Sequence, residues 1–245
     1  MFNARDLGYY TRAQQFAEFP SQNLTAILQR VTYPVLCTIQ DDKVRLSEAY
    51  RNFLRISAFI IFPLMLGLAA ISKPMILLIL KEQWLFTANI LPIICFALMW
   101  YPIHAINLNL LQVEGRTDLL LRIEIIKKII GVLILIISIP YGIYGICIGL
   151  VLNSFISLII NTYYTGKLLS VGFLIQIKDL TPTFIISSIM GLIVYEIINY
   201  ISLPPLFSVI IGIIVGSCLY YILAKIFKFK ELFQLISILN RNRKQ

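Results

Sequence analysis

The chain has 245 residues, of which 59% are hydrophobic and 13% charged, and its mean hydropathy is +0.85. A soluble domain of this length needs a polar exterior, so the composition excludes a soluble protein and predicts one whose solvent is the lipid bilayer. The formal net charge of +9 is typical of basic cytoplasmic loops that face anionic lipid headgroups, and we therefore expect no nucleic-acid partner.

Apolar runs long enough to cross a membrane follow one another along the chain. A crossing helix needs about 20 residues to span about 30 Å of hydrocarbon. A more polar crossing is predicted over 12–38, and six apolar crossings are predicted over 55–72, 88–111, 123–140, 143–164, 180–200 and 205–224. The predicted fold class is all-α, a polytopic transmembrane helix bundle with about seven crossings.

Lysine and arginine residues are concentrated in alternate connections between these crossings. Sixteen of the 21 share four segments, namely 39–55, 113–128, 166–178 and the tail from 225. Four lie in the opposite connections: Arg5, Arg12, Lys73 and Lys81. Because basic loops stay in the cytoplasm, we expect a cytoplasmic C-terminus and a periplasmic amino end. Residues 1–11 hold no signal peptide that would export that end, so we expect the chain to be a C-terminal fragment.

The crossing predicted over 12–38 is amphipathic at 100° per residue. Its polar stripe consists of Glu18, Gln22, Thr25, Gln29 and Thr32, and it is flanked by Arg12, Asn23 and Arg30. The opposite face is apolar and consists of Ala13, Phe16, Ala17, Leu24, Ile27, Val31 and Val35. Since lipid cannot satisfy polar groups, we expect the stripe to face protein or a water-filled cavity. The alternative is a helix lying flat on the membrane surface, which would more often be rich in lysine.

The segment from Ala88 to Gln112 carries a second group of polar residues. Pro92 and Pro102 each remove a backbone donor, and His104, Asn107 and Asn109 follow in the inner half of the bilayer. These side chains could contact a substrate or could hydrogen-bond neighbouring helices, and the residues alone leave both possibilities open. A lone histidine is more often structural than a proton sensor, so we assign His104 no role in coupling.

Other motifs indicate packing and not chemistry. The four cysteines are far apart and mostly within apolar runs, so we expect them to be small apolar fillers. The glycines of GIYGICIG at 142–149, with Gly212 and Gly216, predict close helix packing. The sequence contains no Walker, HExxH or GxSxG motif, and we expect no enzyme activity, no cofactor and no metal.

Three segments together point to a family: LGYYTRAQQFAEFPSQNLTAILQRVTYPVLCTIQDD, AYRNFLRISAFIIFPLMLGLAAISKPMILLIL and PIHAINLNLLQVEGRTDLLLRIEIIKK. They resemble the Wzx-type polysaccharide exporters and lipopolysaccharide-biosynthesis flippases of the multidrug, oligosaccharidyl-lipid and polysaccharide superfamily. The resemblance covers roughly residues 5–180. Such proteins consist of two six-helix bundles, often with two extra C-terminal helices, and work by alternating access.

The resemblance implies a division of the chain into a partial second bundle at 1–165, two additional transmembrane helices at 166–224 and a basic cytoplasmic tail at 225–245. It implies an inner-membrane protein that flips an undecaprenyl-diphosphate-linked oligosaccharide together with a missing N-terminal half. The expected substrate-binding residues are Arg30, Glu18, Gln22, Asn23, Thr25, Gln29, His104, Asn107 and Asn109. The alternatives are a cation-coupled multidrug antiporter on the same fold and an inactive truncated remnant; a membrane glycosyltransferase would need a longer external loop.

Overall fold

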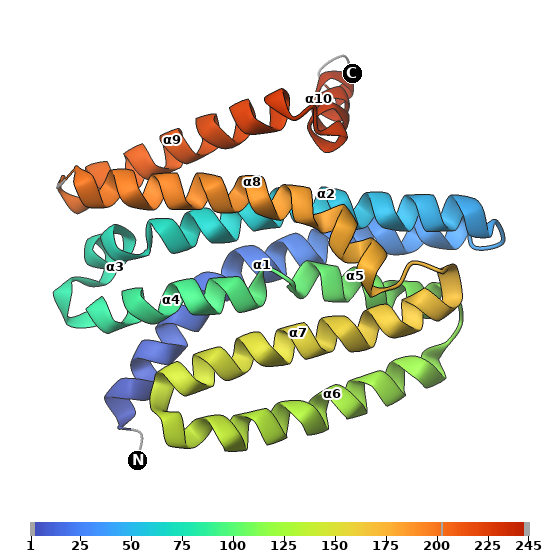
Figure 1. The fold of residues 1–245 in the computed structure, drawn as a ribbon, viewed down its shortest axis with the longest axis horizontal. Helices are drawn as coiled ribbons and strands as arrows, with labels where there is room; N and C mark the ends of the chain where they lie inside the picture. The colour runs from blue at the N-terminus through green and yellow to red at the C-terminus, as the bar shows by residue number, and fades with distance from the viewer. Residues whose placement is uncertain (1–2, 202, 243–245) are drawn as a thin grey trace.

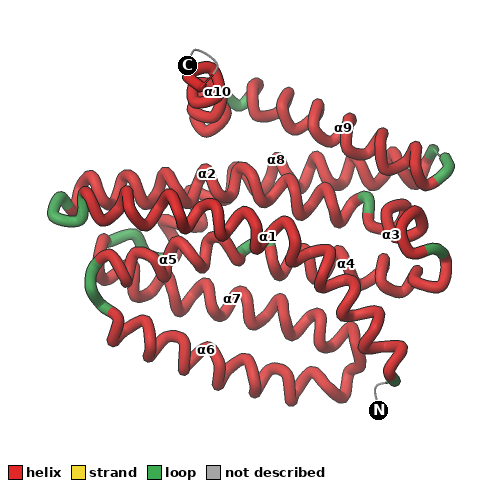
Figure 2. The backbone as a smooth tube through the Cα atoms, turned by 180° about the vertical axis from the view of Figure 1, so that it is seen from behind, coloured by secondary structure: helices red, strands yellow, loops and turns green. Residues whose placement is uncertain are grey.

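The computed structural model describes residues 3–201 and 203–242, and every secondary-structure element within them is helical. The helices are α1 (Ala4–Thr38), α2 (Lys43–Ala70), α3 (Ser72–Leu80), α4 (Leu85–Leu98), α5 (Tyr101–Val113), α6 (Thr117–Ser138), α7 (Gly142–Leu169), α8 (Phe173–Tyr200), α9 (Pro205–Ile226) and α10 (Lys230–Asn242), with short 3₁₀ turns η1 (Glu82–Trp84) and η2 (Ile139–Tyr141). The long helices lie side by side along the longest axis (Figure 1 and Figure 2). The predicted all-α bundle is confirmed.

Five helical stretches of the described residues are long and apolar enough to cross a membrane: Lys43–Ala70, Glu82–Val113, Thr117–Leu169, Phe173–Tyr200 and Pro205–Ile226. The third stretch turns back at η2 into the neighbouring helices α6 and α7, so it supplies two crossings (Figure 1). All six apolar crossings are therefore present. Helix α1 is too polar to be among them, yet it packs along α2, α4 and α5 inside the bundle, and its 35 residues extend over about 52 Å.

Three Lys- and Arg-rich connections meet at one end of the bundle, where α1 joins α2, α5 joins α6 and α7 joins α8, and the turn from α9 to α10 lies nearer the middle of the long axis (Figure 1). Ion pairs cross-link the helices there. Arg51 on α2 forms a bidentate pair with Asp179 on α8, with N···O distances of 2.7 and 2.8 Å, and Lys43 pairs with Glu114. We call this the basic end and the other the opposite end.

Part of the segment predicted as a basic tail forms helix α10, which lies against α2. Glu231 on α10 is buried and lies 3.4 Å from Arg55 on α2, and the ring of Phe229 packs 5.9 Å from that of Phe59. Arg243 and Lys244, which were counted with the tail, lie outside the described residues.

The crossing predicted as one helix over 88–111 is broken into α4 and α5 between Leu98 and Tyr101. Pro102 has no N–H to donate to the carbonyl of Leu98, and the structure satisfies that carbonyl from outside the helix. Ser21 on α1 donates to the Leu98 carbonyl at 2.9 Å, and Ser154 on α7 donates to the Ala97 carbonyl at 2.9 Å. The break therefore joins three helices through side-chain hydrogen bonds.

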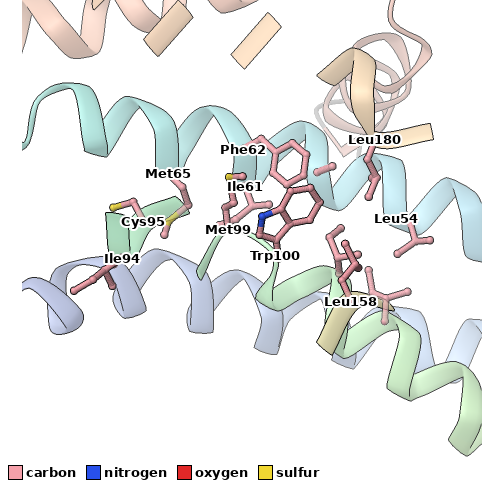
Figure 3. Packing of buried hydrophobic residues seen from close by; sticks show 14 of the residues in the cluster. Leu54, Ile61, Phe62, Met65, Ile94, Cys95, Met99, Trp100, Leu158 and Leu180 are labelled. Carbon is pink, nitrogen blue, oxygen red and sulfur yellow. The ribbon is translucent and has the colours of Figure 1, made fainter. Parts of the chain in front are cut away.

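The hydrophobic core is centred on this break. Trp100 packs its ring 5.1 Å from that of Phe62 on α2, 5.5 Å from Phe155 on α7 and 6.4 Å from Phe184 on α8. Figure 3 shows Trp100 beside Phe62 within the buried cluster. Because these rings come from α2, α7, α8 and the turn between α4 and α5, the core fixes these four elements against one another.

The glycine spacing that predicted close helix packing is confirmed. A Cβ on Gly145 of α7 would lie 2.6 Å from the carbonyl oxygen of Ser138 at the end of α6, and one on Gly149 would collide with the Ser138 hydroxyl. A Cβ on Gly212 of α9 would lie 2.6 Å from Ile71. Each contact is too short for any side chain, so glycine sets the helix separation at both places.

Replacing Gly145 by alanine is therefore expected to lower the free energy of unfolding by about 2 kcal/mol, since overpacking moves α6 away from α7. The matched control is Gly67→Ala, whose Cβ would meet only Met190 at 3.9 Å. It should stabilise α2 by roughly 0.5–1 kcal/mol because alanine favours the helix. Thermal unfolding in detergent micelles measures both, and equal midpoints for the two variants would contradict the packing role of Gly145.

Candidate functional site

The nine residues predicted to bind substrate form two separate groups. Gln22, Asn23, Gln29 and Arg30 are exposed on α1, and Glu18 is half-buried beside them. The second group lies in the interior and consists of Thr25, Asn107 and Asn109, which are buried, and His104, which is half-buried. The structure does not bring all nine to one surface.

The predicted polar stripe of α1 runs along the boundary between a packed face and an exposed face. Thr25 and Thr32 are 4% and 0% exposed and turn toward the bundle, whereas Gln22 and Gln29 turn outward. The face predicted to be apolar is divided as well: Ala13 and Ala17 are buried, while Ile27, Val31 and Val35 are exposed. The polar stripe and the apolar face predicted for this segment are therefore each divided between the packed side and the exposed side of α1.

The physical reason is the size of the contact side chains. Small residues let α1 approach its neighbours closely, so the packed face follows them. The buried residues of α1 are Ala13, Ala17, Ser21, Thr25, Thr32 and Leu36. The larger amides and the arginine are left on the outer face.

Arg30 has no carboxylate within ion-pair distance among the described residues. Its neighbour Asn23 donates to the carbonyl of Phe19 at 2.7 Å, within α1 itself. Phe19 is 74% exposed and Ile27 60% exposed, so the outer face of α1 mixes apolar and polar groups. A guanidinium beside amides in a bundle of this hydropathy needs an anionic partner from outside.

Two further arginines of α1, Arg5 and Arg12, are uncommitted to carboxylates among the described residues, and the predicted site did not include them. Arg5 donates to the hydroxyl of Tyr9 at 2.6 Å, and the guanidinium of Arg12 lies 6.0 Å from the ring of Trp84. The spacing could have revealed them: 12 and 30 are 18 residues apart, which is five full helical turns and places both side chains on one face.

The interior group holds helices together. Tyr50 on α2, Asn107 on α5, Thr165 on α7 and Gln176 on α8 form a four-helix polar cluster in which every side chain is 0% exposed. The Tyr50 hydroxyl donates to Asn107 Oδ1 at 2.8 Å, and Gln176 Nε2 donates to the Tyr50 oxygen at 2.9 Å. Thr165 donates to Asn107 Oδ1 at 3.2 Å. Asn107 therefore lies at a junction of four helices.

Asn109 and His104 have similar packing roles. Asn109 Nδ2 donates to Thr32 Oγ1 at 3.1 Å and so connects α5 with α1. Nε2 of His104 lies 3.2 Å from the hydroxyl of Ser154 on α7. The structure thus favours the interpretation that these polar groups hydrogen-bond neighbouring helices, because their partners lie on other elements of the bundle.

An apolar groove of about 990 Å³ runs beside the outer face of α1. Its floor is α2 and its walls are α1, α3 and α9, with Gly212 and Gly216 on the α9 side. Arg12 and Gln15 of α1 lie on its border and supply two of its few polar groups. The groove is therefore shaped for a long apolar chain that ends in a polar or anionic group.

The fold and these surfaces define a polytopic helical membrane protein. The amino-terminal part, residues 1–89, matches a family model described as polysaccharide biosynthesis protein. An uncharacterized membrane protein in the cps region of Klebsiella pneumoniae is 30% identical over 162 residues, which are 66% of this chain and 33% of that protein. The lipopolysaccharide biosynthesis protein WzxC of Escherichia coli is 26% identical over 161 residues, or 65% of this chain and 33% of WzxC.

Among solved structures, the lipid II flippase MurJ in its inward closed conformation matches with a TM-score of 0.77 and 20% identity, over 93% of this chain and 48% of MurJ. This likeness establishes the fold. The chain spans about a third of the length of the curated relatives it matches. The chain is similar in sequence to polysaccharide-biosynthesis proteins, WzxC among them, and it is an integral membrane protein. None of these relatives bears the name of an enzyme, in agreement with the prediction.

Proposed function

We propose that this chain is part of an exporter that flips a lipid-linked oligosaccharide across the bacterial inner membrane by alternating access. The observation that carries the proposal is the outer face of α1, where Arg30 without a carboxylate partner lies among the exposed amides of Gln22, Asn23 and Gln29. Arginine binds phosphate in a bidentate manner, and amides hydrogen-bond sugar hydroxyls. A diphosphate-linked sugar carries both kinds of group.

The apolar groove supports the same substrate class. An undecaprenyl chain is apolar throughout its length, and the groove offers a matching surface beside Arg12. In the proposed complex the diphosphate contacts Arg30, the sugars contact the neighbouring amides, and the lipid tail runs toward the groove between α1 and α9. Cation-coupled drug export on this fold would favour acidic groups on the exposed face, whereas Arg30 favours an anion.

The proposed orientation places the basic end in the cytoplasm, because Lys- and Arg-rich connections are retained there. The C-terminus is then cytoplasmic and the amino end periplasmic. The outer face of α1 would contact a second bundle, so a cavity would form between the two halves. We keep the division into a partial bundle at 1–165, two added helices at 166–224 and a tail at 225–245 as part of this proposal.

The experiment is translocation of an isotope-labelled undecaprenyl-diphosphate oligosaccharide in proteoliposomes. Vesicles with the full-length exporter, including the first bundle, are expected to expose the sugar on the opposite leaflet, and vesicles with this chain alone are not. Translocation by the chain alone would contradict the two-bundle proposal. A full-length protein that moves a labelled cationic drug but no lipid-linked sugar would favour the antiporter instead.

A further inference from the structure

A second hollow, of about 520 Å³, lies at the opposite end of the bundle and shares no lining residue with the apolar groove. It is enclosed by the first turn of α3, the start of α4, the end of α8 and the start of α9. These four elements meet there because the turns from α2 to α3 and from α8 to α9 lie at the same end of the bundle (Figure 1). We call it the Lys73 hollow.

Besides the buried hydroxyls of Ser72 and Ser208, four larger polar side chains line the Lys73 hollow: Lys73 on α3, Asn89 on α4, and Tyr195 and Asn199 on α8. All four are exposed. None of them makes a side-chain hydrogen bond or an ion pair with another residue in the described part of the chain. Two amides, a phenol and an ammonium group are thus free to bind one ligand.

The surroundings indicate an amphiphilic ligand. Leu77, Ile198 and Leu203 also line the hollow, so its rim is apolar. Tyr200 and Phe207, next to the α8–α9 turn, are 92% and 56% exposed. Aromatic and aliphatic side chains of this kind are typical of the boundary between hydrocarbon and lipid headgroups. The polar hollow would then lie at the depth of the headgroups.

We propose that the Lys73 hollow binds the phosphate-bearing, hydroxyl-rich headgroup of an anionic membrane amphiphile. The Lys73 ammonium contacts the phosphate, because a flexible point charge suits a phosphate diester. The amides of Asn89 and Asn199 and the hydroxyl of Tyr195 bind the headgroup hydroxyls. The acyl chains follow the apolar rim into the bilayer. The site lies outside the groove and the outer face of α1, so it is independent of the proposed transport substrate.

The test is lipid binding by the purified chain in detergent micelles, measured by native mass spectrometry with phosphatidylglycerol or phosphatidylcholine. The wild-type chain is expected to retain phosphatidylglycerol preferentially, and Lys73→Gln is expected to weaken that binding by about tenfold. Lys73→Arg keeps the charge and should retain most of the affinity. The matched control is Lys178→Gln, an exposed lysine at the basic end, which should bind as the wild type does.

Soluble sn-glycerol-1-phosphate distinguishes the two sources of such a group. If it displaces phosphatidylglycerol, the headgroup alone fills the hollow; if it does not, the site requires the acyl chains of a lipid. Asn199→Leu, which keeps Lys73, should also reduce binding, and gel filtration verifies that each variant is folded. Equal phosphatidylglycerol binding by Lys73→Gln and the wild type, or an equal loss in Lys178→Gln, would overturn the proposal.

Discussion

Replacing Arg30 with alanine in the full-length exporter is expected to slow translocation of the lipid-linked oligosaccharide by about tenfold to a hundredfold. A hydrogen bond to a charged group contributes about 1.5–3 kcal/mol, and each 1.4 kcal/mol corresponds to tenfold. Arg30 is exposed and has no carboxylate partner among the described residues, so its loss removes substrate contact and leaves no buried charge behind. The initial rate in proteoliposomes with isotope-labelled substrate measures the effect.

Two matched variants separate charge from position. Arg30→Lys keeps the positive charge but not the bidentate geometry, so it should retain part of the rate. Arg122→Ala removes an equally exposed arginine from α6, on the far side of the bundle from the apolar groove, and should leave the rate unchanged. An unchanged transport rate in Arg30→Ala would contradict the proposed contact between Arg30 and the substrate. An equal loss of rate in Arg122→Ala would show that only the net charge of the protein matters.

The second large effect is expected in the four-helix polar cluster. Asn107→Leu should lower the free energy of unfolding by about 3 kcal/mol, because the hydroxyls of Tyr50 and Thr165 and the amide of Gln176 lose a partner in a dry interior. The loss of local stability should be greatest in α8, which carries Gln176. Denaturant unfolding in micelles gives the energy, and hydrogen exchange of α8 shows the place.

Asn153→Leu is the matched control for this prediction. Asn153 lies on α7, and its Oδ1 is buried without a hydrogen-bond partner, so leucine should cost little there or stabilise the protein. If the two leucine variants unfold within about 0.5 kcal/mol of each other, the polar cluster contributes no more than ordinary packing.

The hydropathy pattern predicted the positions of the crossings, but it did not predict the parts of the helices that extend beyond the apolar runs. The crossing predicted over 205–224 corresponds to α9 (Pro205–Ile226), because its apolar run and the helix coincide. The crossing predicted over 55–72 belongs to α2, which begins twelve residues earlier at Lys43. Asp42 caps that start by accepting hydrogen bonds from the backbone N–H groups of Val44 and Arg45. Aspartate is a preferred N-cap residue, so the sequence could have predicted this helix start, but a hydropathy average contains no capping information.

The candidate site was harder to predict because contacts between distant segments decide it. The helical period correctly grouped the polar residues of α1, yet only the neighbouring helices determine that Thr32 is buried and Gln29 exposed. Asn107 hydrogen-bonds Gln176, which lies 69 residues further along the chain, and no local sequence pattern predicts that pair. A period gives the faces of a helix, whereas tertiary packing selects which face is covered.

The break between α4 and α5 has a mechanical consequence for the proposed alternating access. The Leu98 carbonyl cannot accept a backbone hydrogen bond from Pro102. It accepts one from the hydroxyl of Ser21 on α1 instead, and the Ala97 carbonyl accepts one from the hydroxyl of Ser154 on α7. A rotation there breaks those two hydrogen bonds, about 1 kcal/mol each, and shifts the ring contacts of Trp100, while both helical ladders stay intact. The segment formed by α4 and α5 therefore contains a hinge next to the aromatic core. One of these two helices can tilt there while the other keeps its position.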